Sequence, residues 1–191
     1  MEHAPHRSAS RADPRYSGVA MAFHWLLAGA ILAAFGVGLW MSGLPFSPAK
    51  LQLINWHKWA GVTILLLSAA RLLWRLTHRP PALPARIEGA MPAWQRRAHH
   101  GTHHLMYLLF FAVPLLGWVH SSAKGFPIVW FGVLPLPDLV SPDPRLAEQL
   151  QPWHGLAAWT LMGLVALHVA AALKHQFIDR DGLLDRMRPG R

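Results

Sequence analysis

The stretch that decides the fold runs from Trp153 to Leu173 and reads Trp-His-Gly-Leu-Ala-Ala-Trp-Thr-Leu-Met-Gly-Leu-Val-Ala-Leu-His-Val-Ala-Ala-Ala-Leu. It carries no formally charged side chain, and about 20 apolar residues suffice for a helix to cross a hydrocarbon core of about 30 Å. Its two histidines, His154 and His168, are fourteen residues apart. On a helix that spacing is about 21 Å along the axis and brings both side chains to within about 40° of one face. The stretch predicts a membrane span that presents two imidazoles near opposite leaflets.

Three further apolar blocks precede this span, at Val19–Met41, about Trp56–Leu76 and about His100–Val119. Only 14% of the 191 residues are charged, against about 25% in soluble domains. We therefore predict an all-α integral membrane protein, a four-helix bundle with both termini on one side. The apolar loop 125–137 contains three prolines, and we expect it to lie along the outer interface instead of forming a fifth span.

The charges predict the orientation of the bundle. Of the eighteen Lys and Arg residues, thirteen flank the spans on the side of the termini and four flank them on the other side. Because positive flanks stay inside, we expect both termini to be cytoplasmic. The net charge of +9 is then a signal of topology and of contact with anionic lipid, and nucleic acid is not an expected partner.

The histidines indicate what the bundle holds. The chain has thirteen His and no Cys, which excludes thiolate metal sites and covalently attached c-type haem. By depth, His154 is level with His57 and His168 with His24. Two facing imidazoles at each of two depths suit two six-coordinate b haems in the bundle core. Zinc needs four close ligands and fits this pattern less well.

A four-span scaffold or transporter without a cofactor is the alternative, and it predicts that the four histidines can be replaced without loss of function. Arg71 is the one formally charged residue deep inside an apolar block. It either compensates a haem propionate or reaches the lipid headgroups, and the sequence favours neither.

Several short motifs together resemble the bacterial cytochrome b561 family, over roughly residues 16–189. They are Tyr16-Ser17, Phe23-His24-Trp25, Trp56-His57-Lys58-Trp59-Ala60-Gly61, Tyr107-Leu-Leu-Phe110, Pro114-Leu-Leu-Gly117, Trp153-His154 with His168, and Gly182-Leu-Leu-Asp-Arg-Met-Arg-Pro189. The resemblance implies a di-haem cytochrome of the bacterial inner membrane, with His24, His57, His154 and His168 at the axial ligand positions. It also implies electron exchange with ubiquinone and, for one type, superoxide as the donor.

The substrate sites are less well defined. We expect His100, His103 and His175 near the cytoplasmic face to be candidates for quinone contact, and His99 and His104 to form a polar cap. Lys50, Lys58 and Lys124 near the external pair either steer an anion such as superoxide or anchor the helices at the interface. No catalytic residue is assigned.

The resulting hypothesis has three parts along the chain: a polar arm (1–18), the four-span di-haem domain (19–176) and a basic cytoplasmic tail (177–191). The expected function is electron transfer from superoxide to membrane quinone. The alternative is a cytochrome b subunit that relays electrons for a separate periplasmic or membrane redox enzyme, with loop 125–137 as its docking surface.

Overall fold

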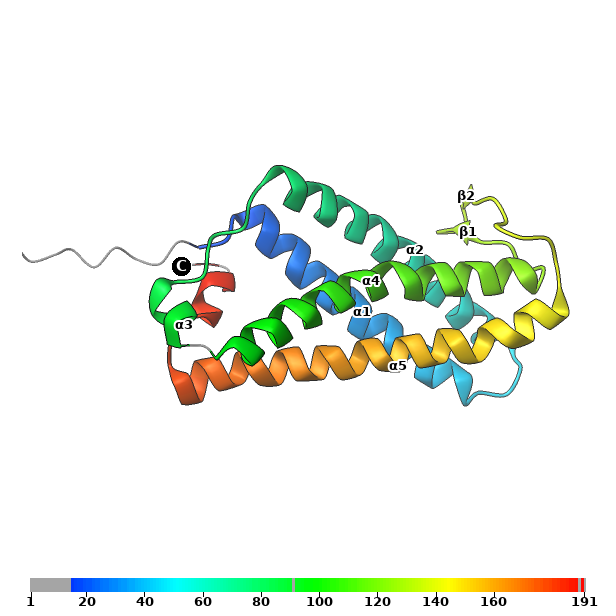
Figure 1. Ribbon diagram of the computed structural model, residues 1–191. Helices are drawn as coiled ribbons and strands as arrows, with labels where there is room; N and C mark the ends of the chain where they lie inside the picture. Colours follow the sequence, from blue (N-terminus) through cyan, green and yellow to red (C-terminus); the bar gives the residue numbers. More distant parts are fainter. Residues whose placement is uncertain (1–14, 91, 189, 191) are drawn as a thin grey trace, which may run out of the picture.

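The computed structural model describes residues 15–90, 92–188 and 190, so most of the predicted polar arm lies outside the described residues. Four helices in this part of the chain are long and apolar enough to cross a membrane. They are α1 (Gly18–Ser42), α2 (Pro48–Thr77), α4 (Ala93–Ala123) and α5 (Pro144–Lys174). The four predicted spans and the all-α bundle are confirmed (Figure 1).

The helices extend beyond the apolar blocks because polar caps start them earlier. Ser47 accepts a hydrogen bond from the Lys50 backbone and precedes Pro48 at the start of α2. Asp143 accepts from the Arg145 and Leu146 backbones at the start of α5. Both are favourable N-caps, and proline suits the first helical turn. The caps place His57 and His154 inside helices instead of at their ends.

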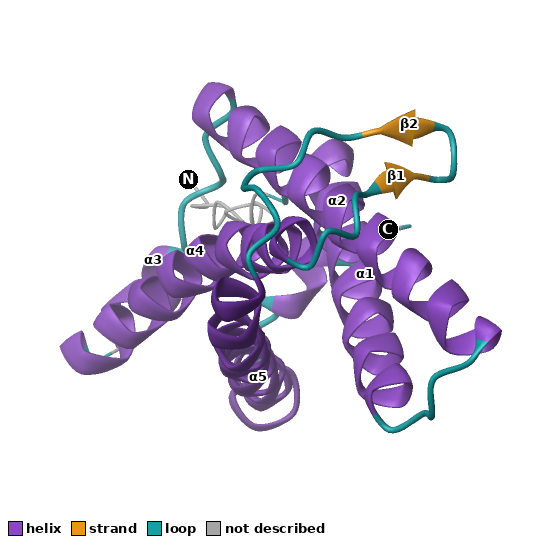
Figure 2. Cartoon of the chain, turned by 90° about the vertical axis from the view of Figure 1, so that its right-hand side faces the viewer, coloured by secondary structure: helices purple, strands orange, loops and turns teal. Residues whose placement is uncertain are grey.

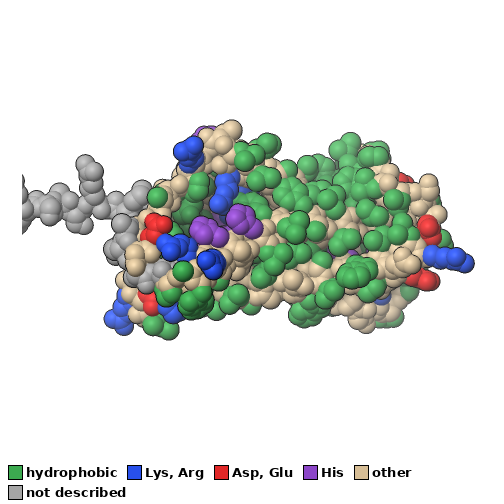
Figure 3. All heavy atoms as spheres, viewed as in Figure 1, with side chains coloured by type: hydrophobic (Ala, Val, Ile, Leu, Met, Phe, Trp, Pro, Cys, Tyr) green, Lys and Arg blue, Asp and Glu red, His purple; other side chains and the backbone are tan. Residues whose placement is uncertain are grey.

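The bundle is built from two helical hairpins, α1 with α2 and α4 with α5, joined where α2 packs against α4. Its core lies in the middle of the bundle and consists of Leu27, Ile31, Ala34, Ile64, Met106, Leu109, Phe110 and Leu161. Large apolar side chains such as Trp40, Leu73 and Trp159 stay exposed. On the face shown in Figure 3, hydrophobic side chains cover the middle of the molecule and charged ones gather at its two ends, as expected for a surface that faces lipid.

One end of the bundle carries a small antiparallel β-hairpin, formed by β1 (Val129–Trp130) and β2 (Leu134–Pro135) (Figure 2). We call this end, after the β-hairpin, the hairpin end. The sequence predicted that loop 125–137 lies along the outer interface and assigned it no secondary structure. The turn uses Gly132 at φ 73°, a conformation that glycine adopts readily. Trp59 of α2 holds the hairpin by donating from its indole to the Val129 carbonyl at 2.6 Å.

The first and last described residues of the chain meet at the opposite end of the bundle (Figure 1). We call this the terminal end. The Tyr16 backbone donates to Arg186 and the Trp25 indole donates to Met187. Arg186 is buried and donates to Pro81 and Ala82. Two short helices complete this end, α3 (Ala85–Ala90) and the 3-10 helix η2 (Leu184–Met187). The tail is therefore tied to the loop between α2 and α4.

Candidate functional site

At the hairpin end, His57 of α2 and His154 of α5 face each other. Their ring centres are 6.1 Å apart and the ring planes are nearly perpendicular, at 89°. An iron atom bound by both rings would set the centres about 6.3 Å apart, because a metal–imidazole bond is about 2 Å long and the nitrogen lies about 1.2 Å from the ring centre. The spacing of this pair fits an axial ligand pair.

The hydrogen bonds of the pair also suit metal binding. The Nδ1 atom of His57 lies 3.0 Å from the Ala34 carbonyl of α1, and that of His154 lies 3.1 Å from the Val113 carbonyl of α4. A carbonyl can only accept, so both Nδ1 atoms carry the proton and both Nε2 atoms keep a lone pair. A backbone carbonyl on the second ring nitrogen is how metal-binding histidines are commonly oriented.

Two glycines make room for these rings. A Cβ atom added at Gly38 of α1 would lie 3.1 Å from Cε1 of His57, and one added at Gly117 of α4 would lie 3.1 Å from Cε1 of His154. Each glycine stands four residues after the carbonyl that its histidine bonds. The missing side chain therefore opens both the space for the ring and the path to the carbonyl. In the sequence, Gly117 was noted only as the end of the Pro114-Leu-Leu-Gly117 motif, and Gly38 was not noted.

At the terminal end, His24 of α1 and His168 of α5 have ring centres 6.2 Å apart, which also fits an axial pair. Arg71 of α2 lies beside them, with Nη2 3.5 Å from Nδ1 of His24 and its guanidinium 5.6 Å from the Tyr107 ring centre. Arg71 is thus directed toward the bundle interior. At 3.5 Å its contact with His24 is electrostatic more than a directed hydrogen bond, so this pair is oriented less firmly than the hairpin-end pair.

The two helical hairpins repeat one pattern of spacings. His24 precedes Gly38 by fourteen residues, as His103 precedes Gly117, and Arg71 follows His57 by fourteen residues, as His168 follows His154. The repeat relates His57 to His154 and places His24, His103, Arg71 and His168 together at the terminal end. His103 lies 5.2 Å from His168 between ring centres. This repeated spacing is the signal that identifies Gly38 and Gly117 in the sequence.

The remaining histidine candidates lie in different surroundings. His103 faces His168, His100 is exposed, and His175 contacts Asp181. His99, which the sequence analysis placed in a polar cap, has its ring centre 4.4 Å from that of His103. His99 therefore belongs to the histidine cluster at the terminal end, together with His103 and His168.

The lysines at the hairpin end make backbone contacts. Lys50 donates to the Leu44 carbonyl at 2.6 Å and Lys58 donates to the Phe126 carbonyl at 3.0 Å. Lys124 is exposed at the end of α4. Lys50 and Lys58 therefore hold the connecting loops at the hairpin end.

Three buried side-chain polar atoms have no hydrogen-bond partner within the described residues: Oγ of Ser68, Nε2 of His120 and Oε1 of Gln176. Ser68 of α2 is fully buried, and no described group bonds its hydroxyl. Buried hydroxyls are normally satisfied. Ser68 stands three residues before Arg71 and thus on the same face of α2, and its hydroxyl is left to bond a polar group of a bound molecule.

Comparison with known proteins places the chain in a family. Residues 15–190 match the family model of prokaryotic cytochrome b561. Cytochrome b561 homolog 2 of Escherichia coli (strain K12) is 33% identical over 184 residues, which covers 94% of each chain. The probable superoxide oxidase CybB of Yersinia pestis is 31% identical over 180 residues, covering 92% of this chain and 96% of that protein. The chain therefore belongs to the prokaryotic cytochrome b561 family, and it is a membrane electron-transfer protein of the kind that holds b-type haem.

Proposed function

We propose that the protein is a di-haem cytochrome that oxidises superoxide and reduces ubiquinone. In this proposal His57 and His154 bind one haem iron at the hairpin end, and His24 and His168 bind a second at the terminal end. The observation that carries it is the presence of two imidazole pairs, one near each end, with ring centres 6.1 and 6.2 Å apart.

The apolar core between the pairs supports two separate centres. Ile31, Phe110 and Leu161 lie on α1, α4 and α5 between the two histidine levels. When bound, b haems would supply one-electron transfer between the two faces. The protein's own part is to fix the four rings and to keep water out of the layer between them.

The proposed orientation puts the terminal end in the cytoplasm, with the donor reaching the hairpin end. It rests on the excess of Lys and Arg near the terminal end. Lys58 and Lys124 add positive charge at the end of the bundle that holds the His57–His154 pair, which raises the encounter rate of an anion such as superoxide.

The overall reaction balances without another reactant. Two superoxide anions each lose one electron and leave as O2, and one quinone takes up these two electrons and two protons to become a quinol. The likeness to a protein named a probable superoxide oxidase supports this choice of donor.

The test uses detergent-purified full-length protein. We expect about two haems per chain in a reduced-minus-oxidised spectrum, rapid haem reduction by a superoxide-generating system, and reoxidation only when ubiquinone is added. His57→Ala or His154→Ala should remove one spectral component and His24→Ala or His168→Ala the other. Losses that group in any other way would contradict the ligand pairs.

The same experiment decides the second candidate function. If both haems are present but do not respond to superoxide, the protein is a relay subunit for a separate redox enzyme. The exposed apolar residues of the β-hairpin region, Phe126, Phe131 and Val133, favour docking of a partner in that case. A protein without haem would refute both functions.

A further inference from the structure

The histidines of the two proposed ligand pairs are oriented in different ways. His57 and His154 each have Nδ1 within 3.1 Å of a backbone carbonyl, whereas no carbonyl in the described part of the chain accepts a bond from His24. The group at its Nδ1 atom is the Arg71 guanidinium, 3.5 Å away, and a guanidinium has no acceptor. The orientation of the His24 ring therefore depends on a different contact.

This contact is made by Trp25, the next residue of α1. The two ring centres lie 5.1 Å apart and the ring planes meet at 86°, which is the edge-to-face arrangement that aromatic rings favour. Consecutive side chains leave a helix about 100° apart, so helix geometry alone does not keep the Trp25 ring against His24. The Trp25 side chain is also 45% exposed, and packing confines it only in part. A directed bond has to hold the indole in place.

The C-terminal tail supplies that bond. The Nε1 atom of Trp25 donates to the Met187 carbonyl at 2.9 Å, although the two residues are 162 positions apart in the sequence. Met187 is the last residue of η2. The end of this short helix therefore lies beside the indole that contacts His24.

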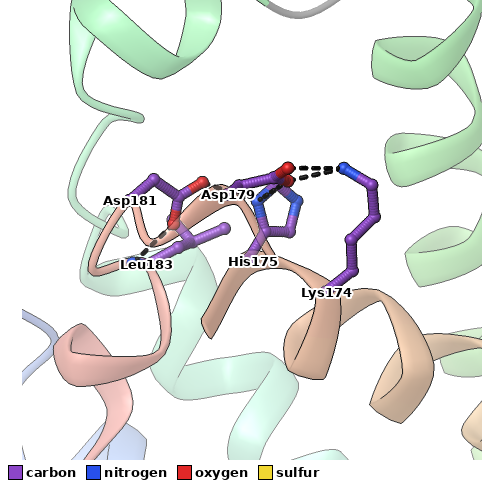
Figure 4. Close-up of polar contacts among 5 residues, drawn as sticks. All are labelled: Lys174, His175, Asp179, Asp181 and Leu183. Carbon is purple, nitrogen blue, oxygen red and sulfur yellow. Dashed lines mark hydrogen bonds and ion pairs between the residues drawn. The ribbon is translucent and has the colours of Figure 1, made fainter. Parts of the chain in front are cut away.

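The tail is fixed where it leaves α5. The π-helical turn η1 (His175–Asp179) is followed by Arg180 at φ 50°, which reverses the chain. As a result Nδ1 of His175 lies 2.6 Å from Oδ2 of Asp181, and the Leu183 backbone donates to Oδ1 of the same carboxylate at 3.0 Å (Figure 4). These contacts close the turn that leads from α5 into η2.

Arg186 fixes the tail a second time, directly before Met187. Its side chain is 3% exposed, and its guanidinium donates to the Pro81 and Ala82 carbonyls at 3.2 and 2.8 Å. Its own carbonyl accepts a bond from the Tyr16 backbone at 3.3 Å, just before α1 begins. The Met187 carbonyl is therefore held in a defined place relative to the start of α1.

We propose that Trp25 is a positioning residue for His24 and that the C-terminal tail, through Arg186 and Met187, is its anchor. The inference rests on the proposed function, in which His24 binds the terminal-end haem iron. It assigns the tail a role in that site, because groups that orient a metal ligand also tune the metal. The tail determines the plane of the His24 ring, as backbone carbonyls determine the planes of the two hairpin-end rings.

The test is electron paramagnetic resonance of the oxidised, detergent-purified full-length protein. The signal of a low-spin haem with two imidazole ligands depends on the angle between the ring planes. This angle is 59° in the terminal-end pair and 89° in the hairpin-end pair, so the two haems should give separate signals. His57→Ala should lack the hairpin-end signal, which assigns both signals.

Trp25→Phe keeps an aromatic ring beside His24 but cannot donate to Met187. We expect its terminal-end signal to shift and broaden while the hairpin-end signal stays unchanged. Transfer of the terminal-end haem to apomyoglobin should become about 2- to 10-fold faster, the factor that corresponds to the loss of one hydrogen bond. A role of Trp25 in overall stability alone would not shift one signal and spare the other.

Arg186→Lys tests the anchor, because lysine keeps the charge but cannot reach two carbonyls with one planar fork. It should shift the terminal-end signal in the same direction as Trp25→Phe. The double variant should show no larger shift than Trp25→Phe alone, since two residues that act through one contact are not additive.

Trp118→Phe is the matched control, because the Trp118 indole also donates from a long helix to a loop carbonyl, that of Pro137 at 3.1 Å, but at the hairpin end. It should leave the terminal-end signal unchanged. An unchanged terminal-end signal in Trp25→Phe would overturn the proposal. A shift in Trp25→Phe without one in Arg186→Lys would show that the tail is not the anchor. A wild-type protein without a terminal-end haem signal would instead refute the proposed function.

Discussion

Gly38→Ala gives the sharpest test of how the helices position the hairpin-end histidines. The new Cβ would lie 3.1 Å from Cε1 of His57, whereas carbon atoms prefer about 3.5–4.0 Å. The ring must therefore move by roughly half an ångström, away from the position in which Nδ1 lies 3.0 Å from the Ala34 carbonyl. Overpacking of this size costs about 1–3 kcal/mol, which corresponds to a loss of about 5- to 150-fold in affinity for haem.

The measurement is the rate of haem transfer from the purified protein to apomyoglobin, followed at wavelengths that separate the two haems. We expect Gly38→Ala to release the hairpin-end haem faster and the other haem unchanged. Gly117→Ala should affect the same haem, since a Cβ there would lie 3.1 Å from His154. Gly36→Ala is the control on α1, because a Cβ at Gly36 meets nothing within 4 Å.

Two results would refute this reasoning. One is equal behaviour of Gly38→Ala and Gly36→Ala, which would mean that the ring does not depend on the open space. The other is an effect of Gly38→Ala and Gly117→Ala on different haems, which would mean that His57 and His154 do not share one iron.

Three further predictions concern other contacts. Arg71→Gln removes a positive charge 3.5 Å from His24 and should lower the midpoint potential of the terminal-end haem by roughly 50–100 mV, as a redox titration would show, because a nearby cation favours the reduced state; an unchanged potential would place Arg71 away from that haem. Arg186→Ala removes two hydrogen bonds from a buried guanidinium and should destabilise the protein by about 2–4 kcal/mol, seen as a lower thermal midpoint and faster proteolysis of the tail. Trp59→Phe removes the 2.6 Å bond to Val129 and should speed hydrogen exchange in the β-hairpin while haem content stays unchanged; loss of haem would show that the hairpin supports the site directly.

The sequence was sufficient for the features that depend on local pattern. Apolar runs of membrane length predicted the four spans, and the spacing of His154 and His168 predicted two levels of histidine on α5. These features depend on the rise and rotation of one helix, so they can be derived without knowledge of its neighbours.

Beyond the pairing of the four histidines by depth, features that depend on how helices approach each other were not predicted. Gly38 and Gly117 matter only because a ring from the adjacent helix lies against each of them. In the sequence, only their position fourteen residues after His24 and His103 separates them from glycines that meet nothing, such as Gly29. His99 lies in the histidine cluster because α4 starts at Ala93, before the predicted apolar block, and gives His99 and His103 the same face. The β-hairpin depends on Trp59, a residue seventy positions before its partner Val129.

The repeated spacing explains why the two ends of the bundle differ in chemistry. At the hairpin end the related positions are both histidine, His57 and His154, and each is oriented by the same combination of glycine and carbonyl. At the terminal end, the residue of α2 that corresponds in the repeat to His168 of α5 is Arg71, so the two helical hairpins differ at this position. His168 instead faces His24 of α1. His103, the counterpart of His24, then lies beside the pair, with its ring centre 5.2 Å from that of His168. One pair is therefore held firmly by two matched carbonyl contacts, while the other lies next to additional imidazoles and an arginine.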